Sequence, residues 1–176
     1  SFTAISVLVI LFFLVPDKSN KIFLITILIP LITFLFFNFS IFKIPKLFLG
    51  DSGSLLLGFI ISFLIIYIAN QEIVHPILLA WSIQIFVYEF IAINLIRLQN
   101  KQGLFKPGKD HLHHYFTKKT NSVILTNFLI CLFNFILFAV GYISFKYINL
   151  QSSLILFIFF FIIFFILRNK FLISQK

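Results

Sequence analysis

Residues 55–69 read LLLGFIISFLIIYIA, fifteen consecutive positions without a charged side chain. Similar apolar stretches occupy residues 2–14, 22–37, 77–95, 123–142 and 154–167. Most of them are close to the roughly 20 residues that a helix needs to cross a bilayer. Because lipid offers the backbone no hydrogen-bond partner, and the stretches lack the alternation of barrel strands, each is predicted to be a helix. The sequence therefore predicts an all-α, polytopic integral membrane protein with about six transmembrane helices.

The composition also indicates a membrane environment. Of the 176 residues, 61% are hydrophobic and 11% are charged, whereas soluble domains carry roughly 25% charged residues. The chain starts with Ser and contains no Met, so we expect residues 1–176 to be a single membrane domain from the C-terminal portion of a larger protein. Cys131, the one cysteine, lies in an apolar stretch and is expected to be a small packing residue.

The formal net charge of +9 follows the expected topology. If successive connections between the apolar stretches alternate sides, eleven of the fourteen Lys and Arg residues fall on one side of the membrane. Short loops rich in Lys and Arg stay in the cytoplasm. We therefore expect cytoplasmic loops at residues 38–53 and 96–122, and a functional site on this face. The basic residues need no nucleic-acid partner to explain them.

The first of these loops ends in FLGDSGS at residues 48–54, directly before an apolar stretch. Its glycines permit tight backbone geometry, and its serines can cap the first N–H groups of a helix. A helix N-terminus favours an anion such as phosphate, and a carboxylate there can bind a Mg²⁺ ion that bridges phosphate oxygens. An ordinary helix start is the alternative, because Asp and Ser are common caps. The residues concerned are Gly50, Asp51, Ser52, Gly53 and Ser54.

The second loop holds three of the four histidines, within the segment KPGKDHLHH at residues 106–114. Imidazoles can hydrogen-bond phosphate, transfer protons or bind metal, and the two lysines add point charges suited to a diphosphate. An incidental cluster in a solvated turn is the alternative, and zinc is not favoured because the spacing does not complete a ligand set. Two spans separate the two loops, so both are expected on one face, where they can share a site.

Glu89 is a third candidate, because it is a carboxylate inside the apolar stretch 77–95. An ionisable residue within a span is costly and is a functional hypothesis by default. Either Glu89 faces the site, or it pairs with a polar neighbour or with Arg97 about two turns later. Gln84 and Asn94 are expected to pack inside the helix bundle.

With these motifs assembled, the chain resembles the polyprenyl-phosphate N-acetylhexosamine-1-phosphate transferase family, glycosyltransferase family 4. The resemblance rests on Asn38, Pro45, Lys46, FLGDSGSL at residues 48–55 and PGKDHLHH at residues 107–114. Their order, spacing and expected membrane side agree with the family over essentially the whole chain. The His-x-His-His pattern is similar to the UDP-GlcNAc branch, whereas the peptidoglycan branch usually shows three consecutive histidines.

The resemblance implies transfer of a HexNAc-1-phosphate, with GlcNAc favoured, from a UDP-sugar to undecaprenyl or another polyprenyl phosphate. UMP would be released, at the bacterial plasma membrane, as the first step of an envelope glycan. It also implies Mg²⁺, or alternatively Mn²⁺, on Asp51, and it allows a homodimer. The implied catalytic residues are Asp51, His111, His113 and His114; the implied substrate-binding residues are Asn38, Lys46, Gly50, Ser52, Gly53, Ser54 and Lys109. Glu89 stands where many relatives have Asp, so the carboxylate is kept but its reach is altered.

Two other interpretations stay open. The family carries paired aspartates on an earlier cytoplasmic loop that this sequence does not contain, so we expect the 176 residues alone to be inactive. An inactive remnant of such a transferase is therefore one alternative, and a non-enzymatic membrane protein such as a transporter is another. A transporter should line several spans with ionisable residues, and only Glu89 qualifies.

Overall fold

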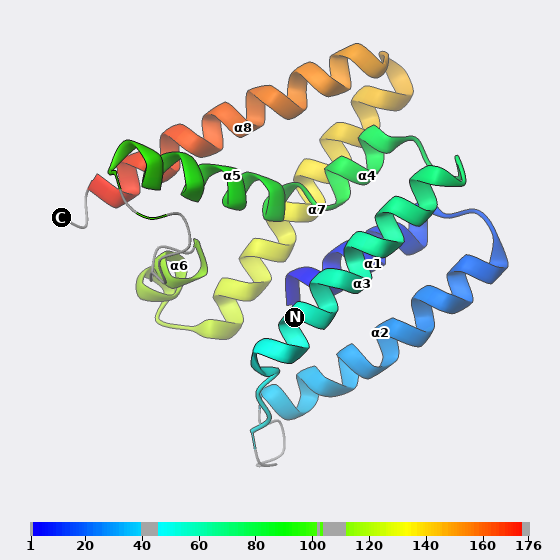
Figure 1. Ribbon diagram of the computed structural model, residues 1–176, viewed down its shortest axis with the longest axis horizontal. Coiled ribbons are helices and arrows are strands. Elements are labelled where there is room, and N and C mark those ends of the chain that lie inside the picture. The colour runs from blue at the N-terminus through cyan, green and yellow to red at the C-terminus, as the bar shows by residue number, and fades with distance from the viewer. Residues whose placement is uncertain (1, 40–45, 102, 104–111, 174–176) are drawn as a thin grey trace. The chain divides into compact units, whose positions relative to one another are not determined.

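Figure 1 shows the computed structural model, which describes residues 2–39, 46–101, 103 and 112–173. The side chains of 112–115 and 170–173 lie outside this description. The helices are α1 (Phe2–Leu14), α2 (Lys18–Asn38), α3 (Gly50–Asn70), α4 (Pro76–Ser82), α5 (Gln84–Gln99), α6 (Leu112–Thr120), α7 (Val123–Tyr147) and α8 (Leu150–Ile173). Within these described residues there is no strand, and the expected all-α class is confirmed.

The helices α2, α3, α7 and α8 are long and apolar enough to cross a membrane by length and composition. A fifth span results if α4 and α5, which are separated by a break at Ile83, count as one. The polytopic class is thus confirmed for the described part of the chain. The expected number of six is not reached by this criterion, because α1 has only 13 residues.

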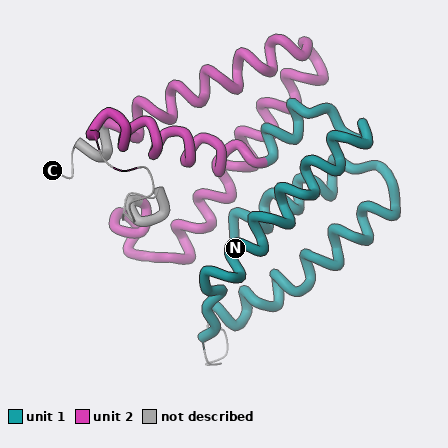
Figure 2. The backbone as a smooth tube through the Cα atoms, viewed as in Figure 1, with its two compact units in different colours: residues 1–82 teal, residues 83–176 magenta. Residues whose placement is uncertain are grey.

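The chain divides into two compact units, residues 1–82 and residues 83–176 (Figure 2). In the first unit α1 is the inner helix, with Val7, Leu8 and Leu11 no more than 1% exposed and with contacts to α2, α3 and α4. The buried residues of α3 recur at intervals of three to four, so they lie on one narrow face of the helix. They are Leu57, Ile61, Leu64 and Ile68.

The second unit is built on a hairpin of α7 and α8, joined by only two residues. The Ser153 hydroxyl donates to the Gly141 carbonyl at 3.2 Å and ties the two helices together near this turn. The helix α5 packs against both. The buried Tyr88 hydroxyl donates to the Phe157 carbonyl at 2.6 Å, and its ring lies against three phenylalanines of α8. Tyr88 therefore links α5 to α8.

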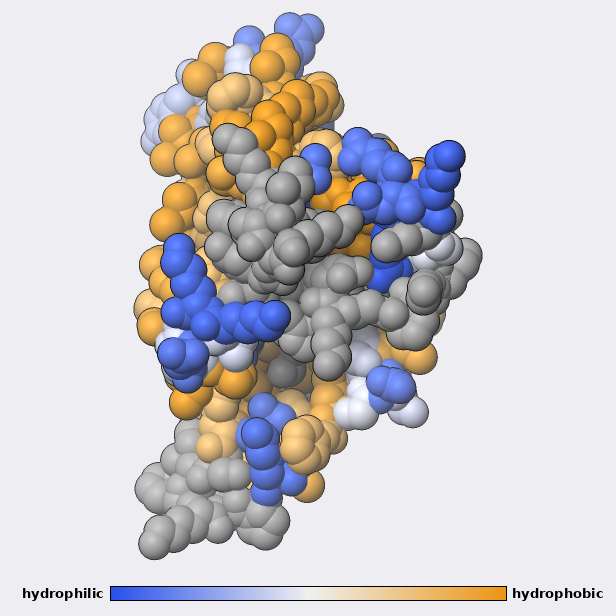
Figure 3. Space-filling view, turned by 90° about the vertical axis from the view of Figure 1, so that its left-hand side faces the viewer, coloured by the Kyte–Doolittle hydropathy of each residue, from blue (hydrophilic) through white to orange (hydrophobic). Residues whose placement is uncertain are grey.

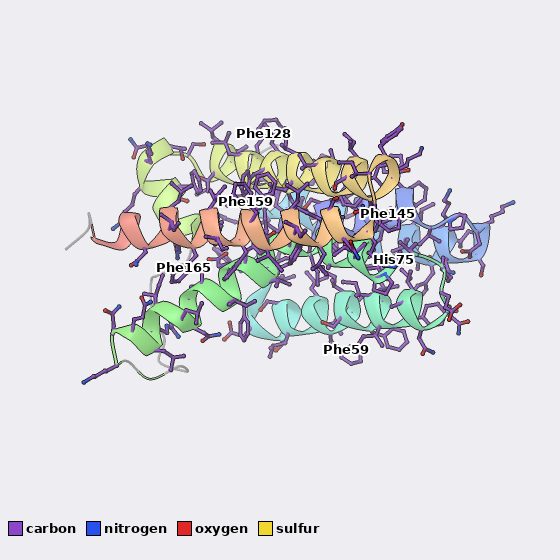
Figure 4. The ribbon with its side chains drawn as sticks, turned by 90° about the horizontal axis from the view of Figure 1, so that it is seen from above. Phe59, His75, Phe128, Phe145, Phe159 and Phe165 are labelled. Carbon is purple, nitrogen blue, oxygen red and sulfur yellow. The ribbon has the colours of Figure 1, made fainter. Side chains whose placement is uncertain are left out.

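Large apolar side chains cover much of the exposed surface. Phe59 is 68% exposed, Phe128 57% and Phe159 52%, and Figure 4 shows Phe59 and Phe128 projecting away from α3 and α7. In the space-filling view of Figure 3, hydrophobic residues form broad areas and hydrophilic residues form separate patches between them. Such a surface is unfavourable in water. It agrees with helices whose outer faces contact lipid.

The buried polar residues are few. Gln84 is fully buried at the start of α5, where its amide donates to the Asn134 carbonyl on α7 at 3.0 Å. The expectation that Gln84 packs inside the bundle is therefore confirmed, and the same holds for the buried Cys131. Asn94 is half-buried. The chain divides into two compact units, and the expectation that residues 1–176 form a single membrane domain stays a prediction.

Helices occupy part of both segments expected as cytoplasmic loops, and the membrane side of these segments stays a prediction. The helix α3 already begins at Gly50, so the glycines and serines of the first motif lie in a helical turn rather than in the loop. In the second loop α5 continues to Gln99, and α6 forms over residues 112–120. Hydropathy missed α6 because its sequence, LHHYFTKKT, is largely polar.

Candidate active site at the start of α3

The first turn of α3 carries the Gly-Asp-Ser-Gly-Ser motif without a side-chain cap. The N-cap residue is Leu49, and no side chain bonds to the first N–H groups. The expected serine cap is therefore wrong. The Ser54 hydroxyl instead donates to the carbonyls of Asp51 at 2.9 Å and Gly50 at 3.1 Å, the back-bonding open to serine within a helix. The initial N–H groups of a helix have no intrahelical acceptor, so here they can bind an anion.

Two glycines shape this turn. Gly50 has φ of +66°, a left-handed conformation in which a Cβ atom is strained. The Leu49 side chain lies directly over Gly53, where an added Cβ would come within 2.8 Å of Leu49 Cγ. Gly50 therefore lets the chain enter the helix, and Gly53 leaves room for Leu49 to fold over the turn. The expectation of tight backbone geometry is confirmed at Gly50, whereas at Gly53 the close contact is made by the Leu49 side chain.

Replacing Gly50 with Ala should destabilise the start of α3 by about 1 kcal/mol, because Ala must adopt the left-handed conformation. Thermal unfolding in detergent measures the loss. Gly58→Ala is the matched control, because a Cβ at Gly58 meets no atom within 4 Å and Ala favours a helix interior. Equal unfolding temperatures for Gly50→Ala and the unsubstituted protein would show that the turn does not need the glycine.

A hydrogen bond holds the segment before α3 against the end of α2. The Asn38 amide nitrogen donates to the Leu47 carbonyl at 2.8 Å. In the same segment the Lys46 ammonium lies 5.4 Å from the centre of the exposed Phe48 ring, a cation–π contact. The expected binding residues Asn38 and Lys46 thus flank the chain that enters the Asp51 turn. Asn38 fixes this segment, a role that sequence reasoning missed because its partner is a backbone carbonyl.

Substituting Asn38 with Ala should lower catalytic efficiency severalfold, because a hydrogen bond worth about 1 kcal/mol no longer holds the segment before Asp51. Asn38→Asp should behave alike, since it keeps the shape but loses the donor. Thr33→Val is the control, because the Thr33 hydroxyl bonds only within α2, to Ile29. The assay is the UMP release described below. Unchanged efficiency in both Asn38 variants would exclude the positioning role.

Asp51 is exposed in the first turn of α3. Within the described ranges no group of three or more His, Cys, Asp and Glu gathers that could hold a metal ion. Mg²⁺, however, is usually held by one or two carboxylates together with substrate phosphates and water. A lone exposed carboxylate beside uncapped N–H groups fits a Mg²⁺ ion shared with a bound diphosphate.

The remaining expected residues belong to the second unit. Lys109 and His111 lie outside the described residues, and His113 and His114 fall on α6 with side chains outside the description. Glu89 and Arg97 are both half-buried on α5. Since the two units are described separately, the meeting of these residues with Asp51 stays a prediction, and both interpretations of Glu89 stay open.

The first 69 residues match the family model described as glycosyl transferase family 4. This range includes α1, α2 and nearly all of α3, and with them Asn38, Lys46 and Asp51. The resemblance to that family is confirmed for this part of the chain. The histidine segment lies beyond the matched range.

Curated relatives agree with the family match. An undecaprenyl-phosphate alpha-N-acetylglucosaminyl 1-phosphate transferase of Yersinia pestis is 32% identical over 88 residues, and its counterpart in Escherichia coli K12 is 30% identical. A probable undecaprenyl-phosphate N-acetylglucosaminyl 1-phosphate transferase of Bacillus subtilis is 40% identical over 86 residues. Each match covers 46% of this chain, and 24%, 24% and 22% of the relatives in that order. No solved structure matches the chain.

Proposed function

We propose that the protein transfers a HexNAc-1-phosphate, with GlcNAc favoured, from a UDP-sugar to undecaprenyl or another polyprenyl phosphate. The observation that carries this proposal is the turn at the start of α3. It presents the Asp51 carboxylate beside uncapped N–H groups and lies within the residues that match glycosyl transferase family 4. The names of the relatives support the lipid acceptor and the GlcNAc donor group.

The proposed reaction is a phosphoryl transfer. An oxygen of the lipid phosphate attacks the sugar-linked phosphorus of the UDP-sugar, and the bond from this phosphorus to the oxygen of UMP breaks. The products are polyprenyl-diphospho-HexNAc and UMP. Catalysis of this type depends mainly on positioning and on stabilising the charge of the transferred group. The N–H groups of the α3 turn bind phosphate oxygens, and Lys46, in the segment before the turn, supplies a positive charge for the same phosphates.

Asp51 would hold Mg²⁺, or Mn²⁺, shared with the diphosphate. When bound, the ion supplies charge neutralisation on the phosphate oxygens. The resemblance assigns His111, His113, His114 and Lys109 to the nucleotide-sugar phosphates. The turn would bind the substrate through its shape and its N–H groups, which come from the segment that contains Gly50, Ser52, Gly53 and Ser54. Glu89 is one further candidate residue in this proposal.

The proposed setting is the plasma membrane of a bacterium, where the product lipid would start an envelope glycan. The exposed apolar surfaces of α2, α3, α7 and α8 support a multi-pass membrane protein. A lipid acceptor of this kind lies in the membrane, where a multi-pass protein can bind it.

The test is UMP release by membranes that contain the full-length protein, supplied with undecaprenyl phosphate. UDP-GlcNAc, UDP-GalNAc and UDP-glucose are compared, each with Mg²⁺ and with EDTA. We expect release that needs both the lipid and the metal and that is fastest with UDP-GlcNAc. No turnover with either UDP-HexNAc would contradict the proposal and favour an inactive remnant or a binding role.

A further inference from the structure

The connection between α6 and α7 consists of two residues, Asn121 and Ser122. Asn121 has φ of +52°, a left-handed conformation that asparagine adopts more readily than most residues. Its N–H donates to the Thr117 carbonyl at 2.9 Å. Ser122 caps α7, because its hydroxyl accepts a hydrogen bond from the Leu125 N–H at 3.3 Å. One helix therefore ends and the next begins within a defined turn.

Thr120, the last residue of α6, is the centre of a hydrogen-bond network in this turn. Its Oγ1 atom lies 2.8 Å from Thr126 Oγ1 on α7. It also lies 2.9 Å from the Phe116 carbonyl oxygen and 3.0 Å from the Ser122 carbonyl oxygen. A hydroxyl has one proton, and a carbonyl oxygen only accepts. Both hydroxyl protons have an acceptor when Thr120 donates to a carbonyl and Thr126 donates to Thr120. The two hydroxyls then join the last turn of α6 to the first turn of α7.

This pair of hydroxyls is shielded from water, since Thr126 is 1% exposed and Thr120 is half-buried. A buried hydroxyl needs a hydrogen-bond partner. A threonine within a helix can bond back to the carbonyl four residues earlier, and Thr26 and Thr33 do so in α2. Thr126 instead bonds across the turn to Thr120. Its hydroxyl therefore connects two helices.

The apolar contact between α6 and its neighbours is incomplete. Phe116 of α6 borders a cavity of about 220 Å³. The other walls come from α7 and α8 and include Leu129, Ile130, Phe164 and Arg168. Side chains that line a void lose part of their packing. A helix as short as α6, with nine residues, is also marginal by itself. The orientation of α6 therefore depends on the hydroxyl pair at its end.

We propose that Thr120 and Thr126 are positioning residues for the histidines of α6. His113 and His114 belong to the same helix, about two turns before Thr120. A helix that is fixed at its end holds the Cα atoms of these histidines in one place relative to α7. The inference rests on the proposed function, in which the histidines bind the phosphates of the UDP-sugar. A loosened α6 would weaken the binding of the UDP-sugar and leave the binding of the lipid acceptor unchanged.

The first measurement is UMP release by membranes that contain the full-length protein, with separate KM values for UDP-GlcNAc and undecaprenyl phosphate. Thr126→Val keeps the shape of the side chain and removes the hydroxyl, whereas Thr126→Ser keeps the hydroxyl and removes a methyl group. We expect Thr126→Val to raise the KM for UDP-GlcNAc roughly fivefold, the scale of one hydrogen bond. The KM for the lipid should not change, and Thr126→Ser should behave like the unsubstituted protein. A larger effect of Thr126→Ser than of Thr126→Val would show that Thr126 acts through packing, and it would overturn the inference.

The second measurement is hydrogen exchange of the full-length protein without substrates, followed by mass spectrometry. Thr126→Val should speed exchange severalfold in peptides from residues 112–120 and leave peptides from α8 unchanged. Thr26→Val is the matched control, because it removes an exposed hydroxyl that bonds within α2, to the Ile22 carbonyl at 3.0 Å. In this control the exchange in α6 and both KM values should equal those of the unsubstituted protein.

The inference is overturned if exchange in α6 is the same in Thr126→Val and Thr26→Val. It is also overturned if exchange in α6 becomes faster while both KM values stay unchanged. If Thr126→Val does not fold, Thr120→Val takes its place and decides in the same way. An unsubstituted protein that releases no UMP would contradict the proposed function, and the positioning role would fall with it. The exchange data would then show separately whether the hydroxyl pair fixes α6.

Discussion

Replacing Asp51 with Asn is expected to reduce UMP release by roughly 100-fold or more, the scale of losing a main stabiliser of transition-state charge. The amide has the size of the carboxylate but lacks the negative charge with which Asp51 would hold Mg²⁺ against the diphosphate. Asp51 is exposed in the first turn of α3, so the substitution should leave folding nearly unchanged. A Mg²⁺ titration of the activity measures the loss and any weaker dependence on the metal.

Asp17→Asn is the matched control for this substitution. Asp17 caps α2 by accepting a hydrogen bond from the Asn20 backbone N–H at 2.9 Å, and this bond lowers the pKa of its carboxyl group. Asn is an equally good N-cap, so both folding and activity should be retained near neutral pH. If Asp51→Asn kept a third or more of the activity at saturating Mg²⁺, Asp51 could not be the metal ligand.

Tyr88→Ala is expected to have the largest effect on stability, about 3 kcal/mol. The substitution removes a side chain that is 1% exposed, together with its packing against Phe157, Phe161 and Phe164. It also removes the hydrogen bond to the Phe157 carbonyl. Tyr88→Phe should lower the stability by only about 0.6–1 kcal/mol. The ring stays in place, and a hydrogen bond between membrane helices contributes about this much.

Reversible unfolding in mixed detergent micelles measures these free energies. Tyr142→Ala is the control, because Tyr142 is a tyrosine of the same unit that is 36% exposed on α7. We expect this control to lose well under half as much stability as Tyr88→Ala. Equal losses in the two variants would mean that α5 is not held to α8 through Tyr88.

The hydrophobic stretches predicted most of the helices, since a run such as residues 55–69 can satisfy its backbone in lipid only as a helix. The break at Ile83 could not be predicted, because residues 77–95 are apolar on both sides of it and contain no glycine or internal proline. The helix α6 was missed for the opposite reason, because it is polar. Hydropathy detects burial in lipid, and it does not detect a kink or a helix outside the span.

The sequence indicated which residues to consider for the candidate site, but it did not indicate the contacts that these residues make. Asn38, Lys46 and Asp51 were selected by their order and spacing, and the structure places them around the entry to α3. The serine cap was wrong because a hydroxyl can both donate and accept, and Ser54 donates to carbonyls of the turn itself. Arg168 was counted only as a topology signal. Its burial in a cavity depends on the packing of α6, α7 and α8, which no local pattern encodes.

The central claim is that the phosphate moves together with the sugar. It is tested most directly with UDP-GlcNAc labelled with radioactive phosphorus at the sugar-linked phosphate, incubated with undecaprenyl phosphate, Mg²⁺ and membranes containing the full-length protein. We expect the label to enter the lipid fraction while unlabelled UMP is released in equal amount. Label that stays in water as UDP, with the sugar alone on the lipid, would contradict it.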